Sequence, residues 1–436
     1  MSRPRPATDH LRPATIHLLQ EETFAYFIHE TNRRNGMVRD KTRRAWPASI
    51  AAVGMALTAY PVGVERGFIR REEAVRRVLT TLRFLWKAPQ GKGTAATGYK
   101  GFYYHFLDME TGRRAHRSEV STVDSALLFA GALTAAAYFQ GDDEREREIR
   151  ALADALYRRA DWRWAMGRGP TVTHGWRPEG GLMPYRWEGY DEALILYVLG
   201  LGSPTHPLPP ESYAAWLSTY EWQEVYGIPQ VAAGPLFVHQ LSHIWIDFRG
   251  IKDAYMRERG IDYFENSRRA TLSQQRYAIA NPHGFRDYNE RCWGLTATDG
   301  PGPRTLTIDG VKRRFYDYVA RGVPDGPDDG TLAPWAVVTS LPFAPEIVVP
   351  TVEYYRDHLR LHAKNPYGFK ATFNATYPER THNPYGWISP YHYGINEGPI
   401  VIMIENDCTG LVWNLMRTCP YVVEGLRRAG FTGGWL

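Results

Sequence analysis

The chain has 436 residues, 44% of them hydrophobic and 23% charged, which is an ordinary balance for a globular protein with a large core. Its 52 basic and 47 acidic residues give a net charge of +5, and the basic pairs are short, which argues against nucleic-acid binding. Aromatic residues are frequent, with 14 Trp, 27 Tyr and 17 Phe. Such an excess suits a site that stacks flat ligand faces, of which sugar rings are the commonest.

Cysteine usage and the N-terminus limit the choices further. Cys292, Cys408 and Cys419 fit neither a disulfide framework nor a zinc pattern, although a single Cys408–Cys419 bridge stays open. No apolar segment typical of a secretory signal follows Met1, and no apolar run approaches 18 residues. We therefore expect no membrane partner and, from the sequence alone, a cytoplasmic protein, with a removed leader left open.

Helical periodicity dominates the chain, and clusters of Gly, Pro and Asp separate the periodic segments. The pattern predicts helices over 13–30, 47–60, 70–86, 121–139, 144–160, 189–201, 211–221, 235–257, 262–281, 332–341, 345–361 and 398–417. The stretch 301–331 is predicted to be a long loop that contains a short hairpin.

About a dozen helices without a fixed-period repeat favour an all-α fold of the (α/α)6 barrel type over a solenoid. In such a toroid six inner helices surround a funnel and six outer helices cover them. Segments 122–139 and 190–201 are almost wholly apolar and suit inner helices, whereas the charged segment 70–86 suits an outer one. We expect residues 1–14 to form a flexible tail and residues 15–436 to form one catalytic domain.

Three carboxylates precede apolar helices and are candidates for catalysis, since glycoside hydrolysis needs two carboxyl groups beside one bond. Asp124 suits an anionic base or a hydroxyl acceptor, because a helix start favours the charged form. Glu192 begins an apolar run, where burial would raise its pKa as a general acid requires. Glu397 lies on a Gly-rich and Pro-rich turn. Each could equally be a capping or first-turn acid, and Ser121 is the expected cap for Asp124.

Two further groups of residues suggest binding. His239, His243 and Asp247 share one face of a predicted helix, as metal ligands could, but this spacing is weak evidence. Hydrogen-bonding residues that line or brace a site are the favoured interpretation, and no metal is expected. Trp293 and Asp299 lie in a loop, which suits sugar stacking beside a hydroxyl acceptor, with a turn aspartate as the alternative.

Several strings, in collinear order over residues 15–436, resemble one family. They are STVDSALLFAG (121–131), GYDEALILYVLGLGSPTHP (189–207), PLFVHQLSHIWIDFR (235–249), DYFENSRRAT (262–271), WGLTATDGP (293–301), DGTLAPWA (329–336), SLPFAPE (340–346) and GINEGPIVIMIEN (394–406). Together they resemble the bacterial glucoamylase-like domain, which includes the endo-β-1,2-glucanases of glycoside hydrolase family 144 and a domain of cyclic β-1,2-glucan synthases.

The resemblance implies an (α/α)6 barrel that hydrolyses β-1,2-glucan with inversion and without a metal or other cofactor. It matches Glu192 to the general acid and Asp124 to an acidic residue near the reacting sugar. Relatives often carry Asp where this chain has Asn396, so the base is Glu397, Asp124 or another residue. The aromatic side chains expected to stack on sugar rings are Trp187, Tyr190, Trp293 and Trp387. The residues expected to bind sugar hydroxyls are Asp124, His239, Arg249 and Asp299.

The resemblance also implies an oligo- or polysaccharide as the partner and a periplasmic location, and we expect a monomer or a weak homodimer. Three other functions stay open. A transglycosylase that retains the anomer would need carboxyls about 5–5.5 Å apart instead of the 6.5–9.5 Å of inverting enzymes. A sugar epimerase or lyase and a glycan-binding protein could use the same fold.

Overall fold

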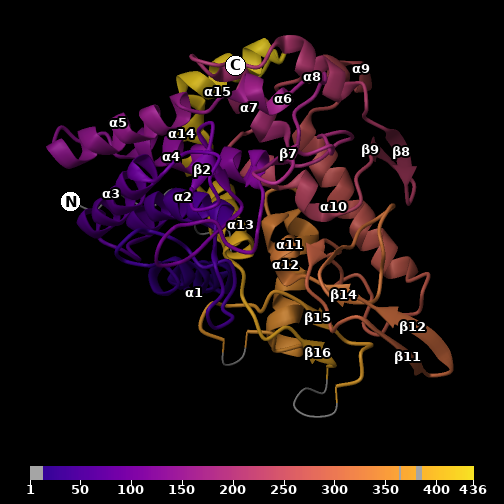
Figure 1. The fold of residues 1–436 in the computed structure, drawn as a ribbon. Helices are drawn as coiled ribbons and strands as arrows, with labels where there is room; N and C mark the ends of the chain where they lie inside the picture. The colour runs from indigo at the N-terminus through magenta and orange to yellow at the C-terminus, as the bar shows by residue number, and fades with distance from the viewer. Residues whose placement is uncertain (1–12, 363–364, 380–384) are drawn as a thin grey trace.

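The computed structural model describes residues 13–362, 365–379 and 385–436, and its helices are much more extensive than its strands (Figure 1). Its strands are only two to five residues long. The tail predicted over residues 1–14 lies outside the described residues except for its last two, where α1 already begins at Ala14. No helix in the described ranges has both the length and the apolar character that a membrane crossing needs.

Five helices are buried along nearly their whole length: α2 (Ile50–Arg66), α4 (Thr122–Tyr138), α7 (Leu194–Gly202), α11 (Pro334–Thr339) and α13 (Gly394–Cys408). Helix α2 packs against α4 and α13, α4 packs against α7, and α11 packs against α13. Such all-round burial explains why these segments are apolar on every face rather than along one stripe.

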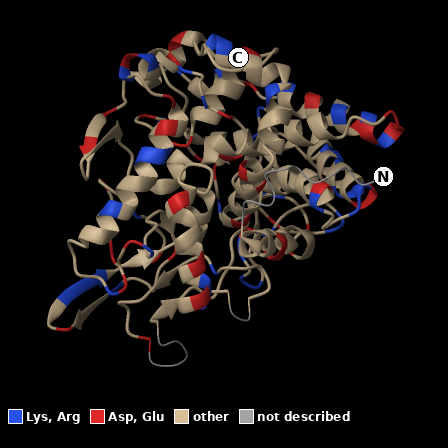
Figure 2. Ribbon diagram, turned by 180° about the vertical axis from the view of Figure 1, so that it is seen from behind, with Lys and Arg blue, Asp and Glu red and all other residues tan. Residues whose placement is uncertain are grey.

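A second set of helices covers the first: α1 (Ala14–His29), α3 (Arg71–Lys87), α5 (Glu144–Arg158), α10 (Tyr263–Ala280), α12 (Pro345–Glu353) and α15 (Pro420–Arg428). Helix α1 packs on α13, α5 on α4, α12 on α11 and α15 on α7. Basic and acidic residues intersperse on these outer elements (Figure 2). Ion pairs Arg71–Glu146 and Arg83–Glu148 join α3 to α5.

Two glycine pairs let buried helices approach closely. A Cβ atom on Gly131 of α4 would lie 2.1 Å from the carbonyl oxygen of Gly54 in α2, and one on Gly54 would lie 2.4 Å from the carbonyl oxygen of Leu127. Gly202 and Gly425 bring α7 and α15 together in the same way, with Cβ contacts of 1.9 Å to backbone oxygens. A side chain at these positions would therefore force the helices apart.

The helix predicted over 235–257 is wrong. The segment forms two 3₁₀ turns, η2 (Leu236–His239) and η3 (Leu241–Ile244), and α9 (Ala254–Arg259) follows. The backbone N–H of Leu236 donates to the carbonyl oxygen of Leu295, and that of Phe237 donates to the hydroxyl of Thr296. Tertiary hydrogen bonds thus replace the i→i−4 pattern that the apolar periodicity predicted.

Short sheets connect the helices. The largest contains β2 (Gly98–Tyr99), β3 (Phe102–Tyr104), β5 (Val120–Ser121), β6 (Gly175–Arg177) and β7 (Gly181–Leu182), all antiparallel in that order. A second contains β14 (Thr331–Leu332), β15 (Phe373–Asn374) and β16 (Trp387–Ile388). The pairs are β1 (Ala48–Ser49) with β4 (Phe106–Leu107), β8 (Trp222–Val225) with β9 (Ile228–Val231), and β10 (Ala297–Thr298) with β13 (Val319–Ala320).

The hairpin predicted within 301–331 is confirmed as β11 (Arg304–Ile308) and β12 (Val311–Phe315), which project from the body (Figure 1). The other elements are α6 (Trp162–Met166), α8 (Pro210–Leu217), α14 (Leu411–Arg417) and the π turn η4 (Tyr354–His358). The Cys408–Cys419 bridge is not formed, since Cys292, Cys408 and Cys419 are all buried thiols.

Candidate active site

The starts of three buried helices meet at one place. Ile50 at the start of α2 donates its backbone N–H to the carbonyl oxygen of His105, and His105 donates its own to that of Glu119. Gly394 at the start of α13 donates to the carbonyl oxygen of Asp40. These bonds gather acidic residues from distant segments around the N-terminal end of α4.

Asp124 lies in the first turn of α4 and is 7% exposed. Ser121 caps the helix as predicted, because its hydroxyl accepts the backbone N–H of Asp124 at 3.2 Å. The Asp124 carboxylate lies 3.7 Å from Nδ1 of His105. Capping therefore uses the backbone of Asp124 and leaves its carboxylate directed at the imidazole.

His105 lies among carboxylates, with its Nδ1 3.1 Å from Glu119 Oε1. Burial lowers the pKa of His105, but the charges of Asp124, Glu119 and Asp40 outweigh it and raise the pKa to about 9. Burial likewise raises the pKa of Glu119, and its hydrogen bond and ion pair with His105 outweigh that effect and lower the pKa to about 2. The site therefore holds an imidazolium between carboxylates at neutral pH.

Glu192 lies before α7, which begins at Leu194, five residues later than the predicted helix. Its neighbour Asp191 forms the turn that leads into the helix, because its carboxylate accepts the backbone N–H of the N-cap residue Ala193 at 2.9 Å. Burial, supported by the charge of Asp124, raises the pKa of Glu192 to about 7. The alternative of a first-turn acid thus does not apply to Glu192, which is suited to donating a proton near neutral pH.

Two more carboxylates complete the acidic cluster, which we define as Asp40, Glu119, Asp124, Glu192 and Asp299. Asp40 accepts the indole N–H of Trp46 at 2.9 Å, and Asp299 accepts hydroxyls of Thr372 at 2.9 Å and Ser389 at 2.6 Å. Burial raises the pKa of both Asp40 and Asp299.

A basic residue borders this acidic cluster. Lys41 lies over the ring of Trp46 at 4.1 Å, and its Nζ is 3.4 Å from the hydroxyl of Tyr393. The cluster therefore carries a cation on the side of Asp40 as well as the imidazolium of His105.

Tyr318 presents an exposed aromatic ring beside the cluster, with 62% of its surface accessible. Thr298 of β10 pairs with Val319 of β13, so Asp299 and Tyr318 lie at the same end of this antiparallel pair. Desolvation of the Tyr318 hydroxyl and the charges of Asp40, Asp299, Glu192 and Asp124 raise the pKa of Tyr318. The hydroxyl end of this side chain therefore lies near four of the five carboxylates.

Glu397 lies behind the cluster in the first turn of α13 and is 1% exposed. Its Oε1 is 3.1 Å from Nδ1 of His392, which is equally buried. Burial raises the pKa of Glu397 well above its usual value and lowers the pKa of His392 to about 3. The two therefore form a neutral buried pair joined by a hydrogen bond. A direct role for Glu397 at a bound sugar does not fit this burial.

Most of the aromatic side chains predicted as stacking platforms are packed in the core. Trp187 stacks on His174 at 4.1 Å and Tyr190 on Tyr263 at 5.7 Å, and they are 7% and 6% exposed. Trp293 is fully buried, with its indole N–H donated to the hydroxyl of Thr351. These rings therefore offer little open face, whereas Trp387 in β16 is half-buried.

The predicted polar ligands also separate. His239 is 1% exposed and lies near Ala233 and Asn266. Arg249 pairs with Asp247 at 2.7 Å and lies over the ring of Trp413, beyond the C-terminal end of α13 and away from the acidic cluster. Asp247 also pairs with Arg417. Because the segment forms two separate 3₁₀ turns instead of one helix, the single helical face predicted for His239, His243 and Asp247 is not formed.

Sequence patterns missed Asp40, His105, Glu119 and Tyr318. None of them begins an apolar helix, so periodicity gives no signal for them. They reach the site through loops and two-residue strands whose partners are far away in the chain. The excess of aromatic residues was the only sequence feature that pointed toward a residue such as Tyr318.

Comparisons with known proteins agree with one another. The Glycoamylase family model, described as "Putative glucoamylase", matches residues 184–420. A solved structure from Bacteroides uniformis with the same description is 32% identical, covers 100% of both chains and has a TM-score of 0.85. An endo-β-1,2-glucanase from Chitinophaga pinensis, solved with sophorotriose and glucose, is 27% identical over 97% of this chain and 99% of its own, with a TM-score of 0.83.

A curated relative is also similar over most of the chain. It is the exo β-1,2-glucooligosaccharide sophorohydrolase (non-reducing end) of Parabacteroides distasonis, 29% identical over 450 residues. The alignment covers 95% of this chain but 57% of that protein, so the chain spans little more than half the length of this relative.

Proposed function

Because the chain belongs to the Glycoamylase family, as its resemblance predicts, we propose that it is a glycoside hydrolase that cleaves β-1,2-linked glucan or its oligosaccharides. Relatives named for action on β-1,2-glucan support the linkage. The observation that carries the reaction class is that Glu192, whose pKa is raised to about 7, lies in the same acidic cluster as Asp124 and within reach of its charge. Two carboxyl groups in different protonation states are what glycoside hydrolysis requires.

In the proposed mechanism Glu192 is the general acid. Its proton passes to the glycosidic oxygen as the bond to the anomeric carbon breaks, and the leaving sugar departs as an alcohol. Asp124 accepts a proton from the water that attacks the opposite face of that carbon, directly or through a substrate hydroxyl. The product has inverted configuration. The imidazolium of His105, 3.7 Å from Asp124, holds the carboxylate in place.

The other carboxylates serve binding in this proposal. Asp40 and Asp299 accept hydroxyl groups of the substrate, and Trp387 contributes a half-buried ring near the site. Glu397 acts through its hydrogen bond with His392, whose backbone N–H and C=O bond to Thr42 next to Lys41. It is therefore a positioning residue for the loop that carries Asp40, and Asp124 is the favoured base.

We also propose that the fold is an (α/α)6 barrel formed by residues 15–436 as one domain. The inner elements pack against one another in two series, α2–α4–α7–η3 and α11–α13–α2, and both series support a ring of inner elements. Gln240, between η2 and η3, donates to the carbonyl oxygen of Ala336 in α11 and to the hydroxyl of Ser340, the residue that follows α11. The sixth inner element is thus a pair of 3₁₀ turns, with α1, α3, α5, α10, α12 and α15 outside.

The test is digestion of linear β-1,2-glucan beside β-1,3-, β-1,4- and α-1,4-glucans, with products separated by size. We expect short oligosaccharides from the β-1,2 polymer alone, and NMR of the first-formed anomer should show inversion. Retention with longer products would indicate transglycosylation instead. Unchanged chain length for all polymers would contradict hydrolysis and leave glycan binding or isomerisation as the function.

A further inference from the structure

Tyr318 is fixed from both sides although its own ring is exposed. Its C-terminal neighbours Val319 and Ala320 form β13, which pairs with β10. Its N-terminal neighbours Tyr316 and Asp317 are held by Arg321, whose Nη2 donates to both of their carbonyl oxygens at 3.3 and 3.2 Å. The backbone position of Tyr318 is therefore determined by buried contacts of the residues on either side of it.

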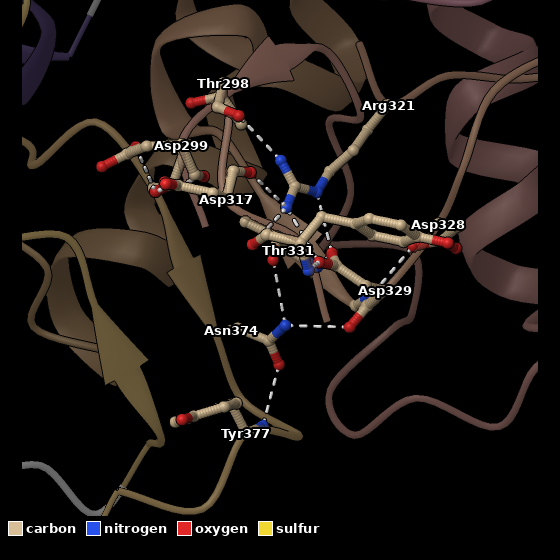
Figure 3. Close-up of polar contacts among 12 residues, drawn as sticks. Thr298, Asp299, Asp317, Arg321, Asp328, Asp329, Thr331, Asn374 and Tyr377 are labelled. Carbon is tan, nitrogen blue, oxygen red and sulfur yellow. Dashed lines mark hydrogen bonds and ion pairs between the residues drawn. The ribbon is translucent and has the colours of Figure 1, made fainter. Parts of the chain in front are cut away.

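Arg321 is the centre of a buried polar network (Figure 3). Its guanidinium and the carboxylate of Asp329 form a bidentate ion pair with both N–O distances at 2.8 Å, and both side chains are 0% exposed. Nη1 of Arg321 donates to the carbonyl oxygen of Thr298 at 2.7 Å, immediately before Asp299. The carboxylate of Asp329 also accepts the backbone N–H of Tyr316 at 2.9 Å.

This clamp, which we define as Arg321 and Asp329, joins the two segments that carry Tyr318 and Asp299. Asn374 extends it, because its side-chain amide donates to the carbonyl oxygen of Asp329 at 2.9 Å and the hydroxyl of Thr331 at 3.0 Å (Figure 3). Burying an ion pair costs desolvation energy, and removing one partner leaves a buried charge uncompensated, so the pair holds its two segments in one geometry. Here the geometry that it fixes is an exposed tyrosine beside a hydroxyl-accepting carboxylate.

We propose that Tyr318 packs its ring against a glucosyl unit bound beside Asp299, and that Arg321 and Asp329 are positioning residues which hold it there. The inference rests on the proposed function. The apolar face of a pyranose ring matches an aromatic face, while Asp299 and Asp40 accept its hydroxyls. Because the clamp orders the backbone that carries Tyr318, little backbone entropy is lost when the sugar binds.

The experiment measures binding without turnover. In a Glu192→Gln parent, calorimetry with linear β-1,2-gluco-oligosaccharides gives Kd for the parent and for added Tyr318→Ala and Tyr318→Phe changes. We expect Tyr318→Ala to raise Kd about tenfold or more and Tyr318→Phe to raise it less than about threefold, since the ring rather than the hydroxyl makes the contact. Tyr226→Ala, at an exposed tyrosine in the β8–β9 turn, is the matched control and should leave Kd unchanged.

The clamp is tested by Asp329→Asn in the same parent, with and without Tyr318→Ala. We expect Asp329→Asn to weaken binding when Tyr318 is present and to have little further effect when it is absent, which a merely structural role would not produce. An unchanged Kd for Tyr318→Ala in a parent that binds overturns this inference alone. A parent that binds no β-1,2-gluco-oligosaccharide, together with wild-type protein that releases no product, overturns the proposed function and this inference with it.

Discussion

The carboxylate of Asp124 lies 3.7 Å from the imidazole Nδ1 of His105, although the two residues come from different segments of the chain. The imidazole also contacts Glu119 at 3.1 Å, so one cation serves two carboxylates. Since the pKa of His105 is raised to about 9, the cation persists throughout the neutral range. This relationship predicts a pH-dependent contribution of His105 to stability.

The first prediction concerns His105→Gln. A histidine whose folded pKa is raised from 6.5 to about 9 contributes stability fully below pH 6.5, and that contribution is lost as the pH rises to 9. The melting temperature of the variant should therefore lie below that of the wild type at pH 6 and approach it at pH 9.5. A difference that stays constant between these pH values would show that His105 is not charged in the folded state.

The second prediction concerns Glu192. The acid is active only when protonated, so kcat/KM of the wild type should fall about tenfold per pH unit above pH 7, where the pKa of Glu192 lies. Glu192→Gln should lower kcat by about 10²–10⁴-fold with unchanged circular dichroism. Glu188→Gln, at an exposed carboxylate four residues earlier, is the control. Near-wild-type turnover of Glu192→Gln would remove Glu192 from the mechanism.

The third prediction separates Glu397 from Asp124. Because burial keeps Glu397 and His392 neutral, the amide of Glu397→Gln, which can donate or accept, can keep the hydrogen bond with His392. Stability should therefore change by less than about 1 kcal/mol and kcat by only a few-fold. Asp124→Asn should lower kcat by about 10²-fold or more. Initial rates on β-1,2-glucan, with urea unfolding, measure both. Equal losses in the two variants would give Glu397 a direct part in the reaction.

The sequence predicted elements well where one signal dominates. Helix α4 was expected over 121–139 and spans Thr122–Tyr138, because its apolar residues and the Ser121 cap agree. The helix predicted over 235–257 was wrong, because an apolar run does not reveal that the backbone of this segment bonds to Leu295 and Thr296. Local signals thus determine the buried helices, and tertiary hydrogen bonds determine the elements between them.

The same limit applies to the site. Asp124 and Glu192 could be proposed from sequence because each precedes a strongly apolar helix. His105 and Tyr318 could not, since they join the cluster only through pairing between distant strands. Trp293 is a residue that the sequence wrongly favoured. Its loop context suggested a stacking surface, but its ring is fully buried and its indole N–H bonds to Thr351.

The fourth prediction tests the close approach of α2 and α4. In Gly131→Ala the added Cβ would lie 2.1 Å from a backbone oxygen of α2, which a side-chain rotation cannot relieve. We expect the free energy of unfolding to fall by about 1–3 kcal/mol. Gly93→Ala, where a Cβ meets nothing within 4 Å and φ is ordinary, should be neutral or slightly stabilising. A neutral Gly131→Ala in urea unfolding would mean that the helices can separate without cost.

The fifth prediction concerns the ion pair between Arg321 and Asp329. Arg321→Met leaves the Asp329 carboxylate buried without its cation, which typically costs about 3–5 kcal/mol. In the wild type, burial raises the pKa of Asp329, but Arg321 outweighs that effect and lowers the pKa. In the variant only the effect of burial remains, so the variant should gain stability as the pH falls and Asp329 is protonated.

The control is a surface ion pair. Arg83→Met removes a half-exposed partner of Glu148 and should cost less than about 1 kcal/mol. Urea unfolding at pH 5 and pH 8 measures both effects. Equal losses for the buried and the surface pair would show that the network around Arg321 is dispensable, and Tyr318 would then need another explanation for its fixed position.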